Sequence, residues 1–398
     1  MHIIESRGGC LPNGENLLFL KACLGQLQET LSAWIEWRKR HTLDAIDGAL
    51  FRMLPLLYYK LQLTDYKDAD LQKLKGIYRH CWYSNQLLFD TIEKLLEKFH
   101  SCHIPTILLK GIALSQNYYP TPYTRPMADG DVLIPLKYVD EAISMLLDMG
   151  WCIRPPSNAC LYSSAILPLK RDYKQTMHGC TFINDEGYEF DLHWYLFPEL
   201  CGGDSDLFWR RAVPCIFRSQ TTLTLSPTDH LLHTCMHGYK WNILHPMRWI
   251  VDAHMIIQEA GNEIEWDFIL AQAKKGKYSL RLLKSLEFLH DKCEIPIPDR
   301  VLASLREMQF SSFERYEHAV VTREREVIAD PKRTVWWHFQ RIWCTHRRRH
   351  SNQPLLVQWI SYPLTLTDEL HLQSTWQLPI LLCKIALKKI KLALAKSG

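Results

Sequence analysis

The hydrophobic pattern changes its period twice along the chain, and this change limits the available folds more than any other feature of the sequence. In residues 15–100, leucine and isoleucine recur every three or four positions, which places them on one face of successive helices. In residues 104–109 and 132–135, short apolar and β-branched runs indicate buried strands. Helical spacing returns after Ser226. The sequence therefore predicts the α+β class, with strands confined to the middle of the chain.

Three consecutive domains are expected from this pattern, and a chain of 398 residues is long enough for two or three. Residues 1–100 are expected to form an N-terminal helical domain, and residues 226–398 a C-terminal helical domain. Residues 101–225 are expected to form a small mixed-sheet module between them. Within this module the order is strand, helix, strand, helix and then a β-hairpin over 181–196, which turns at residues 184–187.

The charge and cysteine content exclude several classes of protein. The 47 basic and 43 acidic residues leave a net charge of only +4, so we expect no nucleic-acid partner, which would require a far more basic chain. The 13 cysteines include no C-x-x-C pair, which argues against zinc ribbons and favours reduced thiols. The first residues lack the apolar core of a signal peptide, and no apolar run is long enough for a transmembrane helix. We therefore expect a cytoplasmic protein.

Two acidic residues at the edge of the second expected strand are candidates for a metal site. Asp129 and Asp131 lie two positions apart, so both carboxylates point to the same side of a strand. They repel each other unless a cation lies between them. The later strand places Asp191 and His193 on one face, and if it lies beside the first strand, Asp191 joins the pair. Three carboxylates can hold two metal ions for displacement at phosphorus.

An alternative is that Asp129 and Gly130 form only a turn, because Asp-Gly is common at hairpin corners. The preceding sequence favours the metal site. Lys110 and Gly111 end an apolar run and open a helix, and such a strand-to-helix turn presents backbone N–H groups to phosphates. Lys110 adds a positive charge, and Arg125 adds another just before the acids.

These motifs together resemble the uncharacterised nucleotidyltransferase family of the polymerase-beta-type superfamily. The resemblance rests on the runs LLKGIALSQNYYP, RPMADGDVLI and YEFDLHWYLF and extends weakly to His237 and residues 248–252. It implies a small mixed-sheet catalytic domain that transfers a nucleoside monophosphate from a nucleoside triphosphate in a metal-dependent reaction. It also implies that Asp129 and Asp131 are the two metal-binding aspartates.

The same resemblance implies that Asp191 is the third carboxylate and that Gly111 is the glycine of the first strand-helix turn. One departure from the family pattern stands out. The residue between the first two acids is usually aliphatic, and here it is Gly130, which removes an apolar anchor from the strand. This departure leaves room for a weakened activity.

Several further features have two readings each. His230, His233 and His237 share a helix face and suggest a zinc site, but no second cluster of ligands adjoins them. The family resemblance implies instead that His237 hydrogen-bonds Asp252 across two antiparallel helices near the site, and the alternative is a buried structural pair. The basic, tryptophan-rich residues 331–353 suit either an anionic partner or a solvated helix face with core tryptophans. The basic amphipathic tail, 378–395, suits either peripheral membrane contact or docking on the protein's own core.

The sequence predicts an enzyme that uses Mg²⁺ or Mn²⁺ to move a nucleoside monophosphate from an NTP, expected to be ATP, to a hydroxyl group of a small-molecule, sugar or peptide acceptor. The alternatives are a scaffold protein that keeps the fold without the chemistry, and a template-independent RNA nucleotidyltransferase. The expected residues fall into three groups: metal-binding and catalytic Asp129, Asp131 and Asp191; nucleotide-binding Lys110, Gly111 and Arg125; supporting His193, His237 and Asp252.

Overall fold

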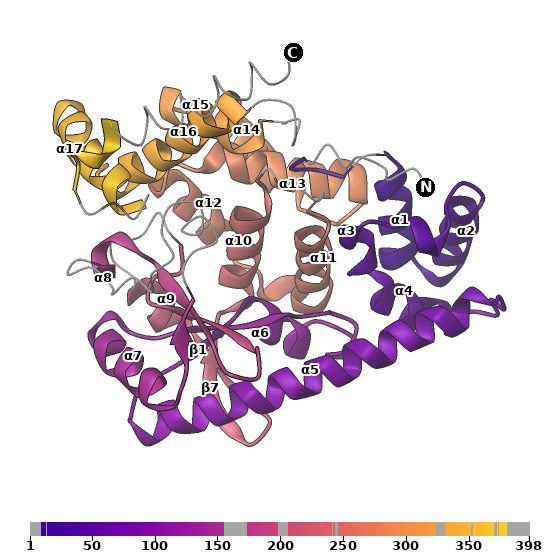
Figure 1. The fold of residues 1–398 in the computed structure, drawn as a ribbon. Coiled ribbons are helices and arrows are strands. Elements are labelled where there is room, and N and C mark those ends of the chain that lie inside the picture. The colour runs from indigo at the N-terminus through magenta and orange to yellow at the C-terminus, as the bar shows by residue number, and fades with distance from the viewer. Residues whose placement is uncertain are drawn as a thin grey trace, which may run out of the picture. The chain divides into compact units, whose positions relative to one another are not determined.

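Strands occur only in the middle of the described chain, between Ile107 and Thr224, and helices form most of the segments on either side (Figure 1). This confirms the α+β class expected from the change in hydrophobic period. The structure is a computed structural model, and it describes residues 9–12, 14–154, 173–197, 206–240, 242, 246–323, 331–351, 353–369, 372 and 374–379.

The chain folds into two compact units, each built from two separate segments. The first unit contains residues 1–133 and 208–325, and the second contains residues 134–207 and 326–398. The three consecutive domains expected from the sequence stay a prediction.

The first unit begins with helices whose aromatic side chains form a common core. Trp34 and Trp37 are fully buried and stack with their ring centroids 5.5 Å apart, and Phe19 meets both rings edge-on. The helices of this segment are α1 (Gly14–Leu24), α2 (Leu27–Arg38), η1 (Leu43–Ala45), α3 (Gly48–Phe51), α4 (Leu54–Leu61) and the 32-residue α5 (Asp70–Ser101).

A seven-stranded mixed sheet contains every named strand, in the order β3-β4-β5-β2-β1-β7-β6. In the first unit, β1 pairs antiparallel with β2 and parallel with β7, so that Leu109 lies opposite Asp131 and Ile107 opposite Leu223. The strands are β1 (Ile107–Leu109), β2 (Asp129–Leu133), β3 (Cys152–Ile153), β4 (Gly179–Ile183), β5 (Glu189–His193), β6 (Val213–Phe217) and β7 (Gln220–Thr224).

Helices α10 and α11 of the first unit pack side by side, and α10 also contacts α6, the helix that follows β1 (Figure 1). The expected helix start at Ser226 is confirmed, because the Ser226 hydroxyl accepts a hydrogen bond from the Asp229 backbone N–H at 3.2 Å and caps α10. The helices that follow β1 in this unit are α6 (Lys110–Asn117), α10 (Pro227–Gly238), α11 (Arg248–Ala260), η5 (Gly261–Glu263), α12 (Trp266–Lys275), α13 (Ser279–Cys293), α14 (Asp299–Glu307) and α15 (Ser312–Thr322). Helix α9 (Asp206–Arg211) contains the point in the chain where the second unit ends at Leu207 and the first unit resumes at Phe208.

The second unit contains the β4–β5 hairpin and two C-terminal helices. The hairpin confirms the expected pair of strands, and Phe190 and Leu192 are fully buried on the face opposite Asp191. In the C-terminal part, Trp343 is buried and stacks on Trp359 with ring centroids 4.2 Å apart. The helices of this unit are η2 (Leu136–Tyr138), α7 (Val139–Asp148), α8 (Tyr173–Thr176), α16 (Pro331–Arg349) and α17 (Leu355–Glu369).

The basic, tryptophan-rich segment therefore forms a helix with Trp343 in its core-facing part, and an anionic partner for it stays a prediction. No helix in the described part of the chain is long and apolar enough to span a bilayer. Most of the expected amphipathic tail, residues 380–395, lies outside the described residues, so its contact with a membrane also stays a prediction.

Candidate active site

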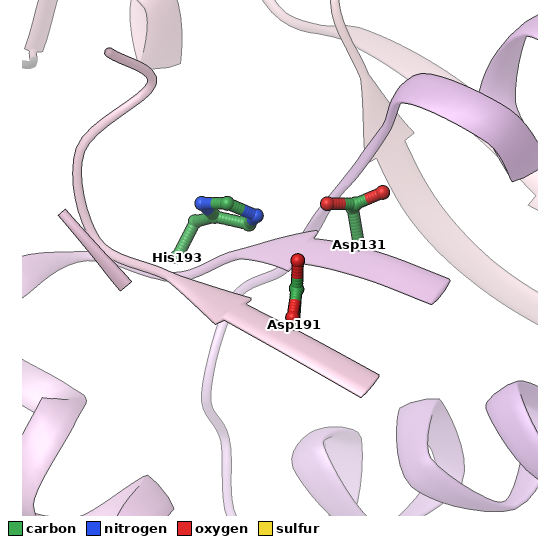
Figure 2. A group of neighbouring side chains, drawn as sticks. All are labelled: Asp131, Asp191 and His193. Carbon is green, nitrogen blue, oxygen red and sulfur yellow. The ribbon is translucent and has the colours of Figure 1, made fainter. Parts of the chain in front are cut away.

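Three polar side chains meet where β2 and β5 are neighbours in the sheet. Asp131, Asp191 and His193 each offer one ligand atom, and these atoms all lie within 4.8 Å of one another. Figure 2 shows Asp131 on one strand and Asp191 and His193 on the next. The backbone fixes this register, because the N–H of Ile134, just after β2, donates to the His193 carbonyl oxygen at 2.9 Å.

The position of Asp191 follows from the β4–β5 hairpin. Thr181 lies directly opposite Asp191, and its hydroxyl donates to Asp191 Oδ1 at 2.6 Å. This bond occupies one side of the carboxylate and limits its rotation. The alternation of the strand places Glu189 and His193 on the same face, as the sequence predicts.

Asp131 is almost fully buried and forms an ion pair with Lys110. The Lys110 ammonium lies 2.5 Å from Asp131 Oδ1, and the Lys110 side chain is 23% exposed. Lys110 also has a φ angle of +44°, in the left-handed region that non-glycine residues rarely adopt. The turn between β1 and α6 therefore brings a cation into direct contact with one of the candidate metal ligands.

Asp129 opens β2 but does not belong to the group of atoms within 4.8 Å of one another. The structure thus brings together two of the three expected carboxylates and adds His193. Between the two aspartates of β2, Gly130 has no room for a side chain. A Cβ atom there would lie 2.3 Å from Ile92 Cδ1 of α5 and 3.1 Å from Ile112 Cδ1 of α6.

The space beside Gly130 is therefore filled by Ile92, which is fully buried. From the sequence, Gly130 is expected to remove an apolar anchor from the strand. The structure gives it a packing role instead, because the glycine lets α5 approach β2 closely.

Gly111 and Arg125, both expected to bind nucleotide, contact each other directly. A Cβ atom on Gly111 would lie 2.7 Å from Arg125 Nη1, so the guanidinium packs against the first turn of α6. Arg125 is buried and donates from Nε and Nη2 to the two oxygens of Asp252 at 2.8 and 2.9 Å. Although burial alone would lower it, the Asp252 carboxylate raises the pKa of Arg125 above its usual value.

The expected hydrogen bond between His237 and Asp252 is replaced by a different pairing. Asp252 accepts from Arg125 and also from the Tyr119 hydroxyl, at 2.6 Å, so both of its oxygens have donors on other elements. Asp252 thereby ties α11 to the loop before β2. Asp252 thus holds the Arg125 guanidinium that packs against the first turn of α6, and the sequence did not indicate the contribution of Tyr119.

His237 lies on the exposed side of α10 and has cations around it. The charge of Lys240, burial of its ring nitrogens and the charge of Lys110 lower the pKa of His237 well below its usual value. The pKa shift therefore reflects the cations that lie close to this exposed ring. Lys240, which no sequence motif indicated, thus joins Lys110 in a positive region around His237.

The other histidines of α10 do not form a metal site. His230 is buried, with its Nε2 atom 2.9 Å from the Thr224 hydroxyl, and burial lowers its pKa to about 3. Among the described residues, only Asp131, Asp191 and His193 form a group with metal-ligand geometry. The structure therefore offers no support for a zinc site on this helix.

The sheet is mixed and carries carboxylates on two adjacent strands, and a strand-to-helix turn earlier in the chain carries a lysine. These features are typical of a domain of the nucleotidyltransferase type. A family model described as "Uncharacterised nucleotidyltransferase" matches residues 51–292, and the chain belongs to this family. The matched segment contains every candidate site residue named above.

Among solved structures, the chain is similar to an antigenic nucleotidyltransferase-like protein from Paracoccidioides brasiliensis, with 15% sequence identity and a TM-score of 0.33. The similarity covers 56% of this chain and 94% of that one. A search of curated proteins gives no significant match.

Proposed function

We propose that the protein is a metal-dependent nucleotidyltransferase, which moves a nucleoside monophosphate from an NTP, expected to be ATP, to an acceptor hydroxyl group. A small molecule, sugar or peptide is the expected acceptor. The observation that carries the proposal is the meeting of Asp131, Asp191 and His193 on adjacent strands, in a chain that belongs to a nucleotidyltransferase family.

The donor atoms of this group suit a divalent cation. The oxygens of Asp131 and Asp191 suit Mg²⁺ or Mn²⁺, and an imidazole nitrogen from His193 favours Mn²⁺ over Mg²⁺. Asp129, at the start of the same strand, is the proposed third carboxylate. When bound, such a cation neutralises phosphate charge and makes the acceptor hydroxyl easier to deprotonate.

The chain's own residues have distinct roles in this proposal. Lys110 lies beside Asp131 and is placed to pair with a phosphate oxygen, while Gly111, which has no side chain, lets the Arg125 guanidinium approach the first turn of α6. Arg125 is buried, so we assign it the role of holding the α6 turn rather than direct contact with nucleotide. Lys110, on α6, and Lys240, just after α10, both lower the pKa of His237, and their positive charge near this residue suits a triphosphate.

The alternative is a scaffold protein that binds a partner without catalysis. Its support in the sequence is Gly130 together with the basic C-terminal third of the chain. The contact between position 130 and Ile92 supplies a packing reason for the glycine. Titration calorimetry with ATP separates the two, because the enzyme proposal requires nucleotide affinity that increases when Mg²⁺ or Mn²⁺ is present.

The direct test is transfer of label from [α-³²P]ATP to acceptors in the presence of Mg²⁺, Mn²⁺ or EDTA. Asp191→Asn is expected to abolish transfer. Asp185→Asn, in the exposed turn of the same hairpin, is the matched control and is expected to leave transfer unchanged. Metal-independent transfer, or full activity of Asp191→Asn, contradicts the proposal.

A further inference from the structure

Helix α17 presents its large apolar side chains to solvent. Leu356 is 71% exposed, and Ile360, one turn further on, is 70% exposed. Leu364 follows at the next turn, so the three side chains lie on one face of the helix. Residues 354–367 contain no charged side chain, and the exposed apolar residues of this helix also include Leu355, Val357 and Trp359. A contiguous apolar face of this kind marks an interaction surface.

Polar side chains lie on the opposite side of α17, which packs against α16 (Figure 1). Gln358 is buried, and its amide nitrogen donates to the carbonyl oxygens of His350 and Gln353 at 3.0 and 2.8 Å. The buried His346 of α16 has its Nε2 atom 2.9 Å from the Gln358 carbonyl oxygen and its Nδ1 atom 2.7 Å from the Thr365 hydroxyl. Rotation of the apolar side inward would leave these buried polar groups without partners, so the hydrogen bonds hold the apolar side outward.

The chain around this face is strongly basic. The last turn of α16 carries Arg347, Arg348 and Arg349, and the bond between His346 and Gln358 holds this turn beside the start of α17. Residues 331–398 contain 11 basic and two acidic residues, a net charge of +9, so the other 330 residues carry −5. The small overall charge of +4 thus conceals a positive C-terminal segment next to the apolar face.

We propose that the apolar face of α17 inserts into the surface of a membrane that contains anionic lipids. A helix with leucine and tryptophan on one side and arginines beside it lies in the plane of the interface, with its apolar side chains among the acyl chains and the cations at the headgroups. With 15 residues, α17 is shorter than the roughly 20 residues needed to span a bilayer, so it lies along the surface.

Charge distinguishes this occupant from two others. A second copy of the chain would bring a second set of the same three arginines to the face. Residues 380–395 would add the charges of four lysines, which are Lys384, Lys388, Lys389 and Lys391. Both occupants place like charges side by side, whereas an anionic lipid surface attracts the arginines and accepts the apolar side chains. The proposal does not depend on the proposed transfer reaction, because no residue of α16 or α17 belongs to the candidate active site.

The experiment is co-sedimentation of the whole chain with vesicles of phosphatidylcholine, with or without phosphatidylserine, in the absence of nucleotide and divalent cations. We expect the chain to bind the vesicles that contain phosphatidylserine and to bind them less at high salt, because salt screens the attraction. Ile360→Gln is expected to weaken binding about tenfold, since it removes one inserted apolar side chain. Ile216→Gln, which removes a 76% exposed isoleucine from β6, is the matched control and is expected to bind as the wild type does.

The double variant Leu356→Gln and Ile360→Gln is expected to lose measurable binding. Both positions are exposed, so we expect the double variant to keep the wild-type thermal midpoint, and a melt separates loss of binding from loss of fold. Arg348→Gln tests the contribution of charge. It is expected to weaken binding to phosphatidylserine vesicles roughly fivefold.

Three outcomes overturn the inference. The wild-type chain stays in the supernatant with both kinds of vesicle; or the double variant binds as tightly as the wild type, which assigns binding to another part of the chain, such as residues 380–395. In the third outcome, light scattering shows a wild-type dimer that the double variant converts to a monomer, which assigns the face to a second copy. Asp131→Asn is expected to bind vesicles as the wild type does, so failure of the proposed function is separable from failure of this inference.

Discussion

At the scale of single residues, Lys110 is the most informative member of the candidate site. Its ammonium lies 2.5 Å from Asp131, and its backbone adopts a φ angle of +44°. A non-glycine residue in this region costs on the order of 1–3 kcal/mol, and such strain persists only where surrounding contacts fix it. The ion pair with Asp131 is one such contact, so the strand-to-helix turn and the carboxylate stabilise each other.

Asp131→Asn is expected to abolish nucleotide transfer while the protein remains folded. Asparagine keeps the shape of the side chain but removes the charge that attracts a divalent cation. Stabilisation by Mg²⁺ plus ATP should disappear with it, because that shift arises only from ligand binding to the native state. Transfer assays and thermal melts with and without Mg²⁺ and ATP check both outcomes. Wild-type turnover by the variant would exclude Asp131 as a ligand.

Thr181→Val tests the support of Asp191. The variant removes the hydroxyl that donates to Asp191 Oδ1 at 2.6 Å, and a hydrogen bond to a charged group contributes about 1.5–3 kcal/mol. We expect kcat/KM to fall roughly ten- to hundredfold if this bond holds the carboxylate in its reactive orientation. Thr181→Ser keeps the hydroxyl and is expected to retain most activity. Equal rates for the valine and serine variants would show that the bond has no positioning role.

At the scale of elements, the contact between α5 and β2 explains why a glycine lies between two aspartates. Gly130→Val is expected to destabilise the protein by about 1–3 kcal/mol, because the new side chain overlaps Ile92 in a filled core. Ile92→Ala opens space at the same point. The double variant should therefore be more stable than the sum of the two single effects predicts, which urea unfolding measures. Strict additivity would contradict the close contact.

Local signals predicted the elements whose shape depends on near neighbours. The hairpin of β4 and β5 follows from alternation around a turn at residues 184–187, and α10 begins at the capping residue Ser226. The strands β6 and β7 were missed. Strand β7 has the sequence QTTLT, without the apolar run typical of a central strand, and its partner β1 lies more than a hundred positions earlier. Such a pairing depends on distant contacts that a local pattern does not contain.

The candidate site was also predictable only where its residues are close together in the sequence. Asp191 and His193 share a face because a strand alternates, and their closeness to Asp131 was expected if the strands were adjacent. The burial of Arg125 and its bond to Asp252 could not be predicted, since they depend on how α11 packs against the loop before β2.

At the scale of the whole molecule, the buried His230 makes stability depend on pH. Its pKa is about 3 in the folded protein, compared with an ordinary value of 6.5, because burial outweighs the nearby Asp252 carboxylate. Below pH 6.5 the unfolded chain binds a proton at His230 that the folded protein does not bind. The free energy of unfolding should therefore fall with decreasing pH, by up to about 1.4 kcal/mol per pH unit from this residue, until the pH reaches about 3.

Urea unfolding between pH 7.5 and 5 tests this dependence. His230→Gln is expected to be less stable at neutral pH, because it loses the fitted ring and its contact with Thr224, but its stability should decline less steeply as the pH falls. His290→Gln, at a half-exposed position on α13, serves as the control and should keep the wild-type slope. Identical slopes for His230→Gln and the wild type would show that another group causes the acid sensitivity.

The parallel pairing of β1 with β7 has a consequence for the order of events on the ribosome. Ile107 pairs with Leu223, so β1 leaves the exit tunnel 116 residues before its partner strand leaves it. At roughly 5–20 residues per second, this delay lasts about 6 to 23 s. During that interval the nascent chain carries a hydrophobic strand with an unpaired edge, which is open to mispairing. The early helices, and α5 above all, emerge first and are available to shield it, so slower translation after β1 would prolong the most vulnerable state of this protein.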